Sequence, residues 1–257
     1  MKQKLILALL ALSFCIFPVN ALSVDCASIA LPEQAAYLER GTTWVAFRAA
    51  SEAYGLAVYW DGEAAHAGEV TAQPGLGYLQ VGDRYIPSAP IRLKNGTIWV
   101  PIRVMAAALG ADVSWNAERE HVTVGAARNS DGQSFYDEQD LYWLSRIIHA
   151  EAQGESLQGK IAVGSVVMAR VQSEDFPDTI YDVIFDTAGG VQFTPTKNGA
   201  IYNTPNEESV TAAKLVLEGE REAEGCLYFL DPRKSTSFWV PQNRTFAVSI
   251  GCHDFYY

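Results

Sequence analysis

The stretch Asp137–Gly154 reads DEQDLYWLSRIIHAEAQG and predicts one amphipathic helix that ends near an acid. Asp137 is a helix-capping residue type at the start of the stretch. Apolar residues follow it at helical spacing: Leu141, Leu144, Ile147 and Ile148. At about 100° of rotation per residue, Glu151 falls on the same face, between Leu144 and Ile147. The sequence therefore places a carboxyl group at the C-terminal end of an apolar helix face.

Two effects disfavour a negative charge on Glu151. Burial removes the carboxylate from water, and the C-terminal end of the helix dipole repels it. Both raise the pKa of the group, and an acid that stays protonated near neutral pH can act as a general acid. Glu151 is therefore the candidate catalytic residue. The alternative is that it lies at the edge of the apolar stripe and reaches solvent.

The first 21 residues have the pattern of a secretory signal peptide. Lys2 and Lys4 precede the apolar run Leu5–Phe17, and a small-x-small cleavage site ends at Ala21. We expect a secreted or cell-wall protein with no stable membrane span after cleavage. The alternative is that the segment stays as an uncleaved anchor. The formal net charge of −11 and the lack of a basic patch argue against nucleic acid as a partner.

Three cysteines lie beyond the predicted signal: Cys26, Cys226 and Cys252. In an oxidising compartment we expect Cys226 and Cys252 to pair, since each lies in a β-like run near the C-terminus. The alternative is that all three are free. No C-x-x-C motif occurs, and His149 and His253 are too few for a zinc amidase, so no metal or cofactor is predicted.

An internal repeat fills the first half of the chain. Trp44-Val45-Ala46-Phe47-Arg48 returns 55 residues later as Trp99-Val100-Pro101-Ile102-Arg103. Each copy reads as a strand, a helix (Phe47–Tyr54 or Ile102–Leu109), a glycine stop and a second strand that ends near Trp60 or Trp115. Residues 22–126 are thus predicted to form a small duplicated α+β domain. We expect its tryptophans in the core, and the alternative is that they form a ligand surface.

The repeat resembles the stalk-type domain named after the N-terminal domain of copper amine oxidases. The second copy, from Trp99 through the A-L-G-A-D-V-S-W-N run to Asn116, carries most of the resemblance. The resemblance implies an accessory module of exported bacterial proteins and no copper. A contact with the cell wall or with a protein through this stalk domain is therefore expected.

A polar linker is predicted at residues 127–137, followed by a second domain at 138–257. Leu157–Val171 is apolar on nearly every side and rich in Gly and Ala, which is typical of a buried central helix. Thr204-Pro205-Asn206-Glu207 predicts a helix start with Thr204 as its cap. Cys226–Leu230 and Phe246–Ile250 look like strands. The fold class predicted for the whole chain is α+β.

The second domain resembles the SleB/CwlJ family of cell-wall hydrolases along its whole length. The matching segments begin with Ile148–Glu155 (IHAEAQGE) and Gly159–Val167 (GKIAVGSVV). Further segments follow in order: Phe176-Pro177, Gln192-Phe193-Thr194-Pro195, Asn198-Gly199, Thr204-Pro205-Asn206, Leu227-Tyr228-Phe229 and Ile250-Gly251-Cys252-His253. Gln153 and Ala169 depart from a common Arg and a common Asn.

The resemblance implies a lysozyme-like, mainly helical catalytic domain with a small β-sheet and Glu151 as its catalytic acid. The implied partner is the peptidoglycan glycan strand, cleaved between N-acetylmuramic acid and N-acetylglucosamine. One Glu acting first as acid and then as base would give lytic transglycosylation. Ordinary hydrolysis and a non-catalytic wall-binding role remain alternatives, and the stalk module puts a role in germination in doubt.

Five further residues are candidates for substrate binding: Gln192, Phe193, Tyr228, His253 and Glu155. Gln192 is a candidate to hydrogen-bond Glu151 or an N-acetyl group, and Phe193 and Tyr228 to stack on sugar rings. Turn or core structure is an equal alternative for each of these. His253 either lines a cleft or satisfies a backbone carbonyl. Glu155 is also the candidate second carboxylate that ordinary hydrolysis would need, if it lies opposite Glu151 across a cleft. A solvated loop acid is the alternative that we favour for it.

Overall fold

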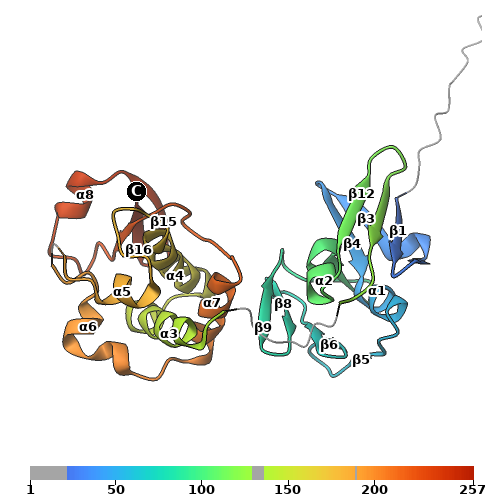
Figure 1. Cartoon of the computed structure of the whole chain (residues 1–257), viewed down its shortest axis with the longest axis horizontal. Helices are drawn as coiled ribbons and strands as arrows, with labels where there is room; N and C mark the ends of the chain where they lie inside the picture. Colours follow the sequence, from blue (N-terminus) through green and yellow to red (C-terminus); the bar gives the residue numbers. More distant parts are fainter. Residues whose placement is uncertain (1–21, 129–135, 189) are drawn as a thin grey trace, which may run out of the picture.

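The computed structural model describes residues 22–128, 136–188 and 190–257, which form an N-terminal and a C-terminal unit (Figure 1). The predicted signal peptide and most of the predicted linker lie outside the described residues. The N-terminal unit is rich in strands and the C-terminal unit is mainly helical with one small sheet, which confirms the predicted α+β class. No helix in the described ranges is long and apolar enough to cross a membrane.

The N-terminal unit combines short strands with two seven-residue helices, α1 (Phe47–Ala53) and α2 (Ile102–Ala108). Its strands are β1 (Ser23–Cys26), β2 (Ile29–Ala30), β3 (Ala36–Glu39), β4 (Thr42–Ala46), β5 (Val58–Trp60), β6 (Ala65–Ala67), β7 (Val70–Ala72), β8 (Tyr78–Val81), β9 (Arg84–Pro87), β10 (Arg92–Lys94), β11 (Thr97–Pro101), β12 (Val113–Asn116) and β13 (His121–Val124). A 3₁₀ turn spans Glu33–Ala35. The two predicted helices are therefore confirmed, each one residue shorter than expected.

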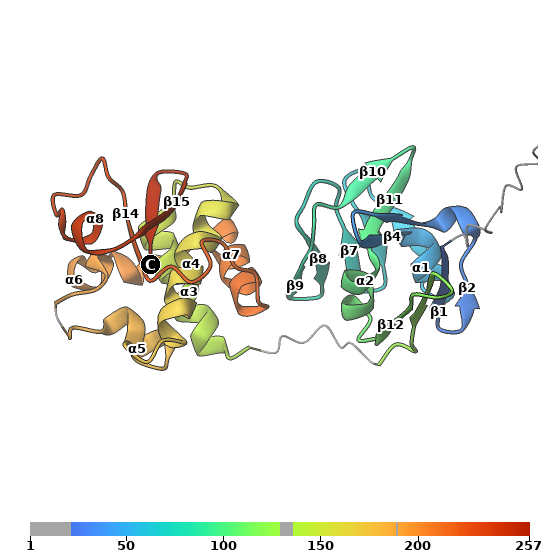
Figure 2. The same cartoon turned by 90° about the horizontal axis from the view of Figure 1, so that it is seen from above.

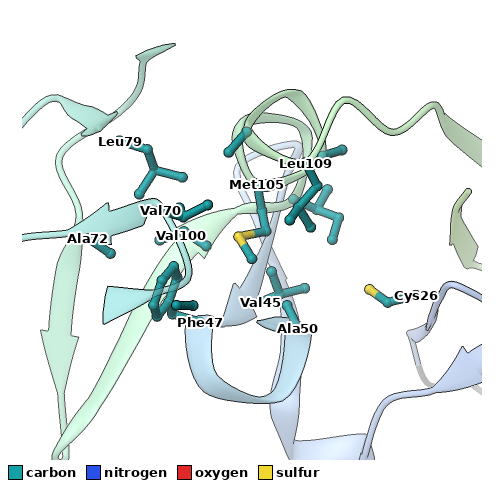
Figure 3. Close-up of a cluster of buried hydrophobic side chains, with 14 of the residues drawn as sticks. Cys26, Val45, Phe47, Ala50, Val70, Ala72, Leu79, Val100, Met105 and Leu109 are labelled. Atoms are coloured by element: carbon teal, nitrogen blue, oxygen red, sulfur yellow. The ribbon is translucent and has the colours of Figure 1, made fainter. Parts of the chain in front are cut away.

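A local two-fold axis relates the two copies of the repeat. β4 and β11 pair antiparallel at the centre of the sheet β10-β11-β4-β3, with Val45 opposite Val100. These two valines are equivalent positions of the two copies (45 + 55 = 100), so the axis passes between them. Their side chains pack with Phe47 and Met105 in the core shown in Figure 3. Duplication thus places each copy's helix beside the other copy's strand.

The tryptophans of this unit differ in exposure: Trp44 is covered, whereas Trp60 and Trp115 are exposed. Trp44 is 2% exposed and lies under the guanidinium group of Arg92, whose Cζ is 3.7 Å from the ring centroid. Trp60 and Trp115 are 47% and 42% exposed. The prediction of buried tryptophans is therefore wrong for Trp60 and Trp115. Both lie on strands at the edge of a sheet, β5 and β12, where no neighbouring strand covers their outer side.

The C-terminal unit is a helical core closed by the antiparallel sheet β14-β16-β15 (Figure 2). Its helices are α3 (Glu138–Ala152), α4 (Leu157–Val171), α5 (Ile180–Phe185), α6 (Thr194–Asn198), α7 (Glu207–Leu217) and α8 (Trp239–Asn243), with a 3₁₀ turn at Ala200–Tyr202. The strands are β14 (Tyr228–Leu230), β15 (Phe246–Ile250) and β16 (His253–Tyr256). β15 has the predicted bounds, and β14 begins two residues later than expected.

Helix α4 is the centre of this unit, as its composition predicts. It packs against α3, α5 and α7, and most of its side chains are buried. Asn206, and not Thr204, caps α7, because its side chain accepts the N–H of Ser209 at 2.9 Å. The backbone of Asn206 has the extended conformation of a cap, and the helix begins at the next residue.

The predicted disulfide is wrong: Cys26, Cys226 and Cys252 are all free. Tyr228 pairs with Tyr256, so Cys226 lies beyond the end of β16, whereas Cys252 precedes the start of that strand. The two cysteines are therefore separated by more than the length of β16, roughly 15–20 Å at the usual rise per residue. A disulfide requires Cα atoms within about 7 Å.

Among the described residues, two ion pairs join the two units: Arg84 with Glu218, and Lys214 with Asp83, whose Nζ and Oδ1 lie 3.9 Å apart. Arg84 at the start of β9 donates from Nε and Nη2 to the two carboxylate oxygens of Glu218, each at 2.8 Å. Both side chains are largely buried, at 12% and 9% exposed. Tyr136 lies close to this pair, and burial raises the pKa of its phenol above the usual range, with Glu218 adding to the effect. The hairpin β8–β9 thus faces α7 (Figure 1).

We predict that Gly164→Ala destabilises the chain by about 1–3 kcal/mol although alanine favours helices. A Cβ at Gly164 would lie 2.8 Å from Cδ1 of Ile148 on α3 and 3.1 Å from Cγ2 of Val216 on α7. Gly154→Ala is the matched control, since nothing lies within 4 Å of its added Cβ and its φ is not positive. Urea denaturation measures both. Equal stability of the two variants would contradict the close packing of α3, α4 and α7.

Candidate active site

Glu151 lies in the last turn of α3, whose phase is set by its cap and its apolar face. Asp137 caps the helix by accepting the N–H of Gln139 at 2.7 Å. Leu144, Ile147 and Ile148 are fully buried beneath the helix, as predicted. Glu151 follows on this face and is partly exposed. Its carboxyl group is therefore embedded in apolar surroundings and still within reach of a molecule at the surface.

His149 does not belong to this group of residues. It is two positions before Glu151, which turns it about 200° away around the helix. Its ring is buried, at 7% exposed, and Nδ1 accepts the backbone N–H of Asn206 at 3.3 Å. His149 therefore ties α3 to the start of α7.

Burial raises the pKa of Glu151 to about 7, and the positive charge of Arg170 opposes the rise. This agrees with the increase expected from its place on the apolar face. Within the described ranges, no group donates a hydrogen bond to its carboxylate, so nothing in them holds it in the ionised form by direct contact. An acid with a pKa near 7 can release and recover a proton near neutral pH.

Arg170, which the sequence reading missed, lies in α4 with only 5% of its surface exposed. Its Nε donates to the carbonyl oxygen of Leu227 at 2.8 Å. Burial lowers its pKa to about 10, while Tyr228, Asp186 and Glu151 act in the opposite direction. The signal in the sequence is a cationic residue inside an otherwise apolar helix, because burying an unpaired charge is costly.

Aromatic rings surround the guanidinium group of Arg170. Its Cζ lies 4.9 Å from the ring centroid of Phe176, 5.0 Å from that of Phe193 and 5.6 Å from that of Tyr228. Its Nη1 is buried and has no hydrogen-bond partner among the described residues. Cation–π attraction holds the charge in place where water is excluded. The result is a buried cation whose charge opposes the rise in the pKa of Glu151.

Phe193 is not available to stack on a sugar, so that prediction is wrong. Its side chain is 2% exposed and belongs to the hydrophobic core beneath α3 and α4. One side of the ring faces Arg170, and its centroid is 6.4 Å from that of Phe229. Burial of the ring in the core explains the difference.

Tyr228 is half-buried and connects Arg170 to an exposed aromatic edge. Its hydroxyl accepts a hydrogen bond from Nη2 of Arg244 at 2.9 Å. The guanidinium group of Arg244 lies over the rings of both Tyr228 and Trp239, at 4.5 and 4.8 Å. Trp239 is 51% exposed and neighbouring Phe238 is 70% exposed. Tyr228 therefore keeps its candidacy for sugar contact, and Trp239 joins it as a residue that sequence reasoning missed.

Glu155 is an anchor for the β15–β16 turn and not a solvated loop acid. Its Oε2 accepts the backbone N–H of Cys252 at 3.0 Å. A Cβ on Gly251 would overlap this oxygen, and Gly251 has a φ of +59°, a backbone conformation that favours glycine beside the carboxylate. Burial alone would raise the pKa of Glu155, but the contacts with Cys252 and the charge on His253 and Arg233 leave it below its usual range.

Gln192 and His253 lie apart from Glu151 in their contacts. Gln192 donates from Nε2 to the carbonyl oxygens of Ala188 and Gly190, at 3.2 and 3.3 Å, and so holds its own loop. His253 is 8% exposed and packs edge-on against Phe229, 5.4 Å between ring centroids. Burial lowers its pKa, whereas the charges of Glu155 and Asp231 oppose the change. A role of either residue in substrate binding stays a prediction.

No group of three or more His, Cys, Asp or Glu side chains within the described ranges is placed to hold a metal ion. A hollow of about 380 Å³ in the C-terminal unit is lined by Ser165, Gln172, Arg221 and Glu224, among others, and not by Glu151 or Arg170. The candidate catalytic feature is therefore the largely buried carboxyl group of Glu151, with the charge of Arg170 acting on it, and not this hollow.

Parts of this sequence are similar to known proteins. A sequence profile described as Cell Wall Hydrolase matches residues 154–256. The Cell wall hydrolase CwlJ of Oceanobacillus iheyensis is 31% identical over 103 residues, which are 38% of this chain and 72% of that protein. The chain belongs to the SleB/CwlJ family of cell-wall hydrolases. Residues 80–133 also match the Copper amine oxidase N-terminal domain, which confirms the second resemblance.

Two further relatives match the chain over about half of its length. A Spore cortex-lytic enzyme of Halalkalibacterium halodurans is 32% identical over 121 residues, which are 46% of this chain and 36% of that enzyme. The catalytic domain of the germination-specific lytic transglycosylase SleB from Bacillus anthracis is 32% identical, with a TM-score of 0.44 over 49% of this chain and 99% of that domain. The chain thus spans less than half the length of such spore cortex-lytic enzymes. The match to the Cell Wall Hydrolase profile includes Glu155 and Tyr228 but begins three residues after Glu151.

We predict that Glu151→Gln gains stability relative to the native chain as pH rises. Because burial raises the pKa of Glu151 from 4.5 to about 7, the folded chain keeps a proton that the unfolded chain has lost between these values. This contribution is fully present below the lower value and is lost as pH rises through the upper one. The stability difference should change by on the order of 2–3 kcal/mol between pH 4 and pH 8. Urea denaturation across this range measures it, and a constant difference would contradict the raised pKa.

We predict that Arg170→Met raises the pKa of Glu151 further, because it removes the charge that opposes the effect of burial. NMR titration of the glutamate side-chain carboxyl carbons measures the change. Lys197→Met is the control, since Lys197 is an exposed cation in α6. A pKa that stays the same in Arg170→Met and in the control would show that Arg170 does not act on Glu151.

Proposed function

We propose that this chain is an exported enzyme that cleaves the glycan strand of peptidoglycan between N-acetylmuramic acid and N-acetylglucosamine, as a lytic transglycosylase. The single observation that carries the proposal is the carboxyl group of Glu151, which burial holds at a pKa of about 7. The family supports a wall substrate, since its members carry names such as Cell wall hydrolase. A wall substrate in turn requires a location outside the cytoplasmic membrane.

The first step is proton donation. Glu151 in its acid form protonates the glycosidic oxygen as the bond from C1 of N-acetylmuramic acid breaks. The departing N-acetylglucosamine leaves with a new hydroxyl group, and positive charge builds at C1. Glu151 is now a carboxylate in apolar surroundings, and the fixed charge of Arg170 stabilises this form. Arg170 is therefore a positioning residue for the reaction.

The second step returns the proton. The carboxylate of Glu151 takes the proton of the C6 hydroxyl of the same sugar, whose oxygen forms a bond to C1. This closes a 1,6-anhydro ring and leaves Glu151 protonated for the next cycle. The nucleophile is tethered to the reacting carbon, so no second carboxylate is needed to activate water. The engagement of Glu155 with the N–H of Cys252 supports the lytic route, because the acid nearest in sequence is occupied elsewhere.

We predict that Glu151→Gln lowers release of fragments from purified peptidoglycan at least 100-fold, the usual order for loss of a general acid. Glu138→Gln is the matched control, since it makes the same substitution at an exposed position of the same helix. Mass spectrometry of the products of the native chain should find 1,6-anhydro-N-acetylmuramic acid ends, one water lighter than hydrolysed ends.

Each other outcome selects an alternative. Equal activity of Glu151→Gln and Glu138→Gln would rule out Glu151 as the acid. Reducing ends without anhydro rings would indicate ordinary hydrolysis by a muramidase. Binding to peptidoglycan without release of any fragment by the native chain would indicate a non-catalytic wall-binding protein.

A further inference from the structure

The N-terminal unit carries two hollows that the two-fold axis between Val45 and Val100 relates to each other. Their volumes are about 790 and 530 Å³. The turn of the β3–β4 hairpin and the first residues of α2 line the larger one, and the turn of the β10–β11 hairpin and the first residues of α1 line the other. Each hollow is therefore made mainly by a hairpin from one copy of the repeat and a helix from the other. The larger hollow is lined as well by Glu220 of the C-terminal unit and by Pro87, Ser88 and Ala89. We call them the paired grooves.

Equivalent side chains occupy equivalent places in the paired grooves. Leu38 and Gly41 in the larger groove correspond to Leu93 and Gly96 in the other, 55 positions later (38 + 55 = 93). Arg103 and Trp115 in the larger groove correspond in the same way to Arg48 and Trp60 in the other. The sites thus repeat the same three side-chain types, Leu, Arg and Trp, at the same positions of the fold.

These side chains remain open to a ligand. The exposed fractions are 51% for Leu38, 55% for Leu93, 47% for Trp60 and 42% for Trp115. Arg48 and Arg103 are exposed as well, and Arg48 donates to the carbonyl oxygen of Val58 at 2.9 Å, which fixes it beside β5. Exposed large apolar side chains that recur in a shaped hollow mark an interaction site.

We propose that the paired grooves bind the glycan strand of peptidoglycan, with a sugar ring against each of Trp60 and Trp115. An indole ring offers the flat apolar face that a pyranose covers, and the arginine beside it supplies N–H donors for N-acetyl carbonyl oxygens. The chain has a formal net charge of −11, so acidic wall polymers are repelled, whereas muramic acid carboxyl groups that are amide-linked to stem peptides carry no charge. The choice of glycan rests on the proposed function.

A repeating polymer suits two equivalent sites. Each groove alone offers a limited contact. Once one groove holds a glycan strand, the other groove meets the same strand or a neighbouring one at a raised effective concentration. The N-terminal unit would thereby keep the C-terminal unit near its substrate between cleavage events. Neither Trp60 nor Trp115 contacts the candidate active site, so binding and cleavage can be measured separately.

The test uses the full chain carrying Glu151→Gln, so that the wall is not degraded during the measurement. In this background Trp60→Ala and Trp115→Ala are compared with Ile29→Ala, which removes an equally exposed side chain (52%) of the same unit outside both grooves. Co-sedimentation with insoluble peptidoglycan, stripped of acidic polymers, measures the affinity. Each tryptophan variant should weaken binding by roughly three- to tenfold and the double variant by more than either. Trp115→Phe, which keeps a ring, should lose less than Trp115→Ala.

Competition identifies the ligand. Uncharged oligomers of N-acetylglucosamine should displace the chain from peptidoglycan, and free stem peptides should not. The proposal is overturned if the double variant binds like Ile29→Ala, or if only stem peptides compete. The same double variant with Glu151 intact should cleave soluble glycan fragments at the native rate. If the tryptophan variants lose binding while Glu151→Gln still cleaves fragments at the native rate, the grooves remain the binding site. That result overturns only the proposed catalytic role of Glu151.

Discussion

The close packing of α4 against α3 and α7 is the constraint on which the candidate active site depends. Gly164 lets Ile148 and Val216 approach the backbone of α4, and no larger residue fits there without a shift. This approach fixes α3, which carries Glu151, relative to α4, which carries Arg170. The pKa of Glu151 then reflects a balance between burial, which favours the acid, and Arg170, which favours the carboxylate. A looser packing would let water weaken both effects.

The two acids of the A-E-A-Q-G-E segment have different tasks because their surroundings differ. Glu151 has apolar neighbours and no hydrogen-bond donor within the described residues, so it holds a proton near neutral pH. Glu155, four positions later, accepts the N–H of Cys252 and is held ionised. It connects the α3–α4 loop to the turn between β15 and β16, and Gly251 makes room for it. One glutamate thus supplies the candidate chemistry and the other joins helices to the sheet.

In the N-terminal unit, gene duplication has a direct structural consequence. Because β4 and β11 pair across the two-fold axis, each copy contributes one side of each hollow. A site built in this way occurs twice, and neither copy contains a complete groove. The hairpin β8–β9 lies between the repeats in the chain and reaches α7 of the C-terminal unit. There Arg84 and Glu218 form a buried ion pair with two hydrogen bonds. The accessory unit is therefore attached to the helical unit through residues outside the duplicated elements.

The sequence by itself determined what depends on short-range periodicity and on internal comparison. It placed α3, its cap Asp137 and the face of Glu151, the buried helix α4, and the two copies with their 55-residue spacing. Neighbouring residues fix these features through helical geometry, so a single chain reveals them.

Only the tertiary structure decided features that join residues distant in the chain. Arg170 meets Leu227 and three aromatic rings, and the effect of its charge on Glu151 cannot be read from helical spacing. Phe193 is buried in the core, and Trp60 and Trp115 are exposed because they lie on edge strands. The strand register separates Cys226 from Cys252. In each case residue type allowed more than one environment, and the packing of distant elements selected among them.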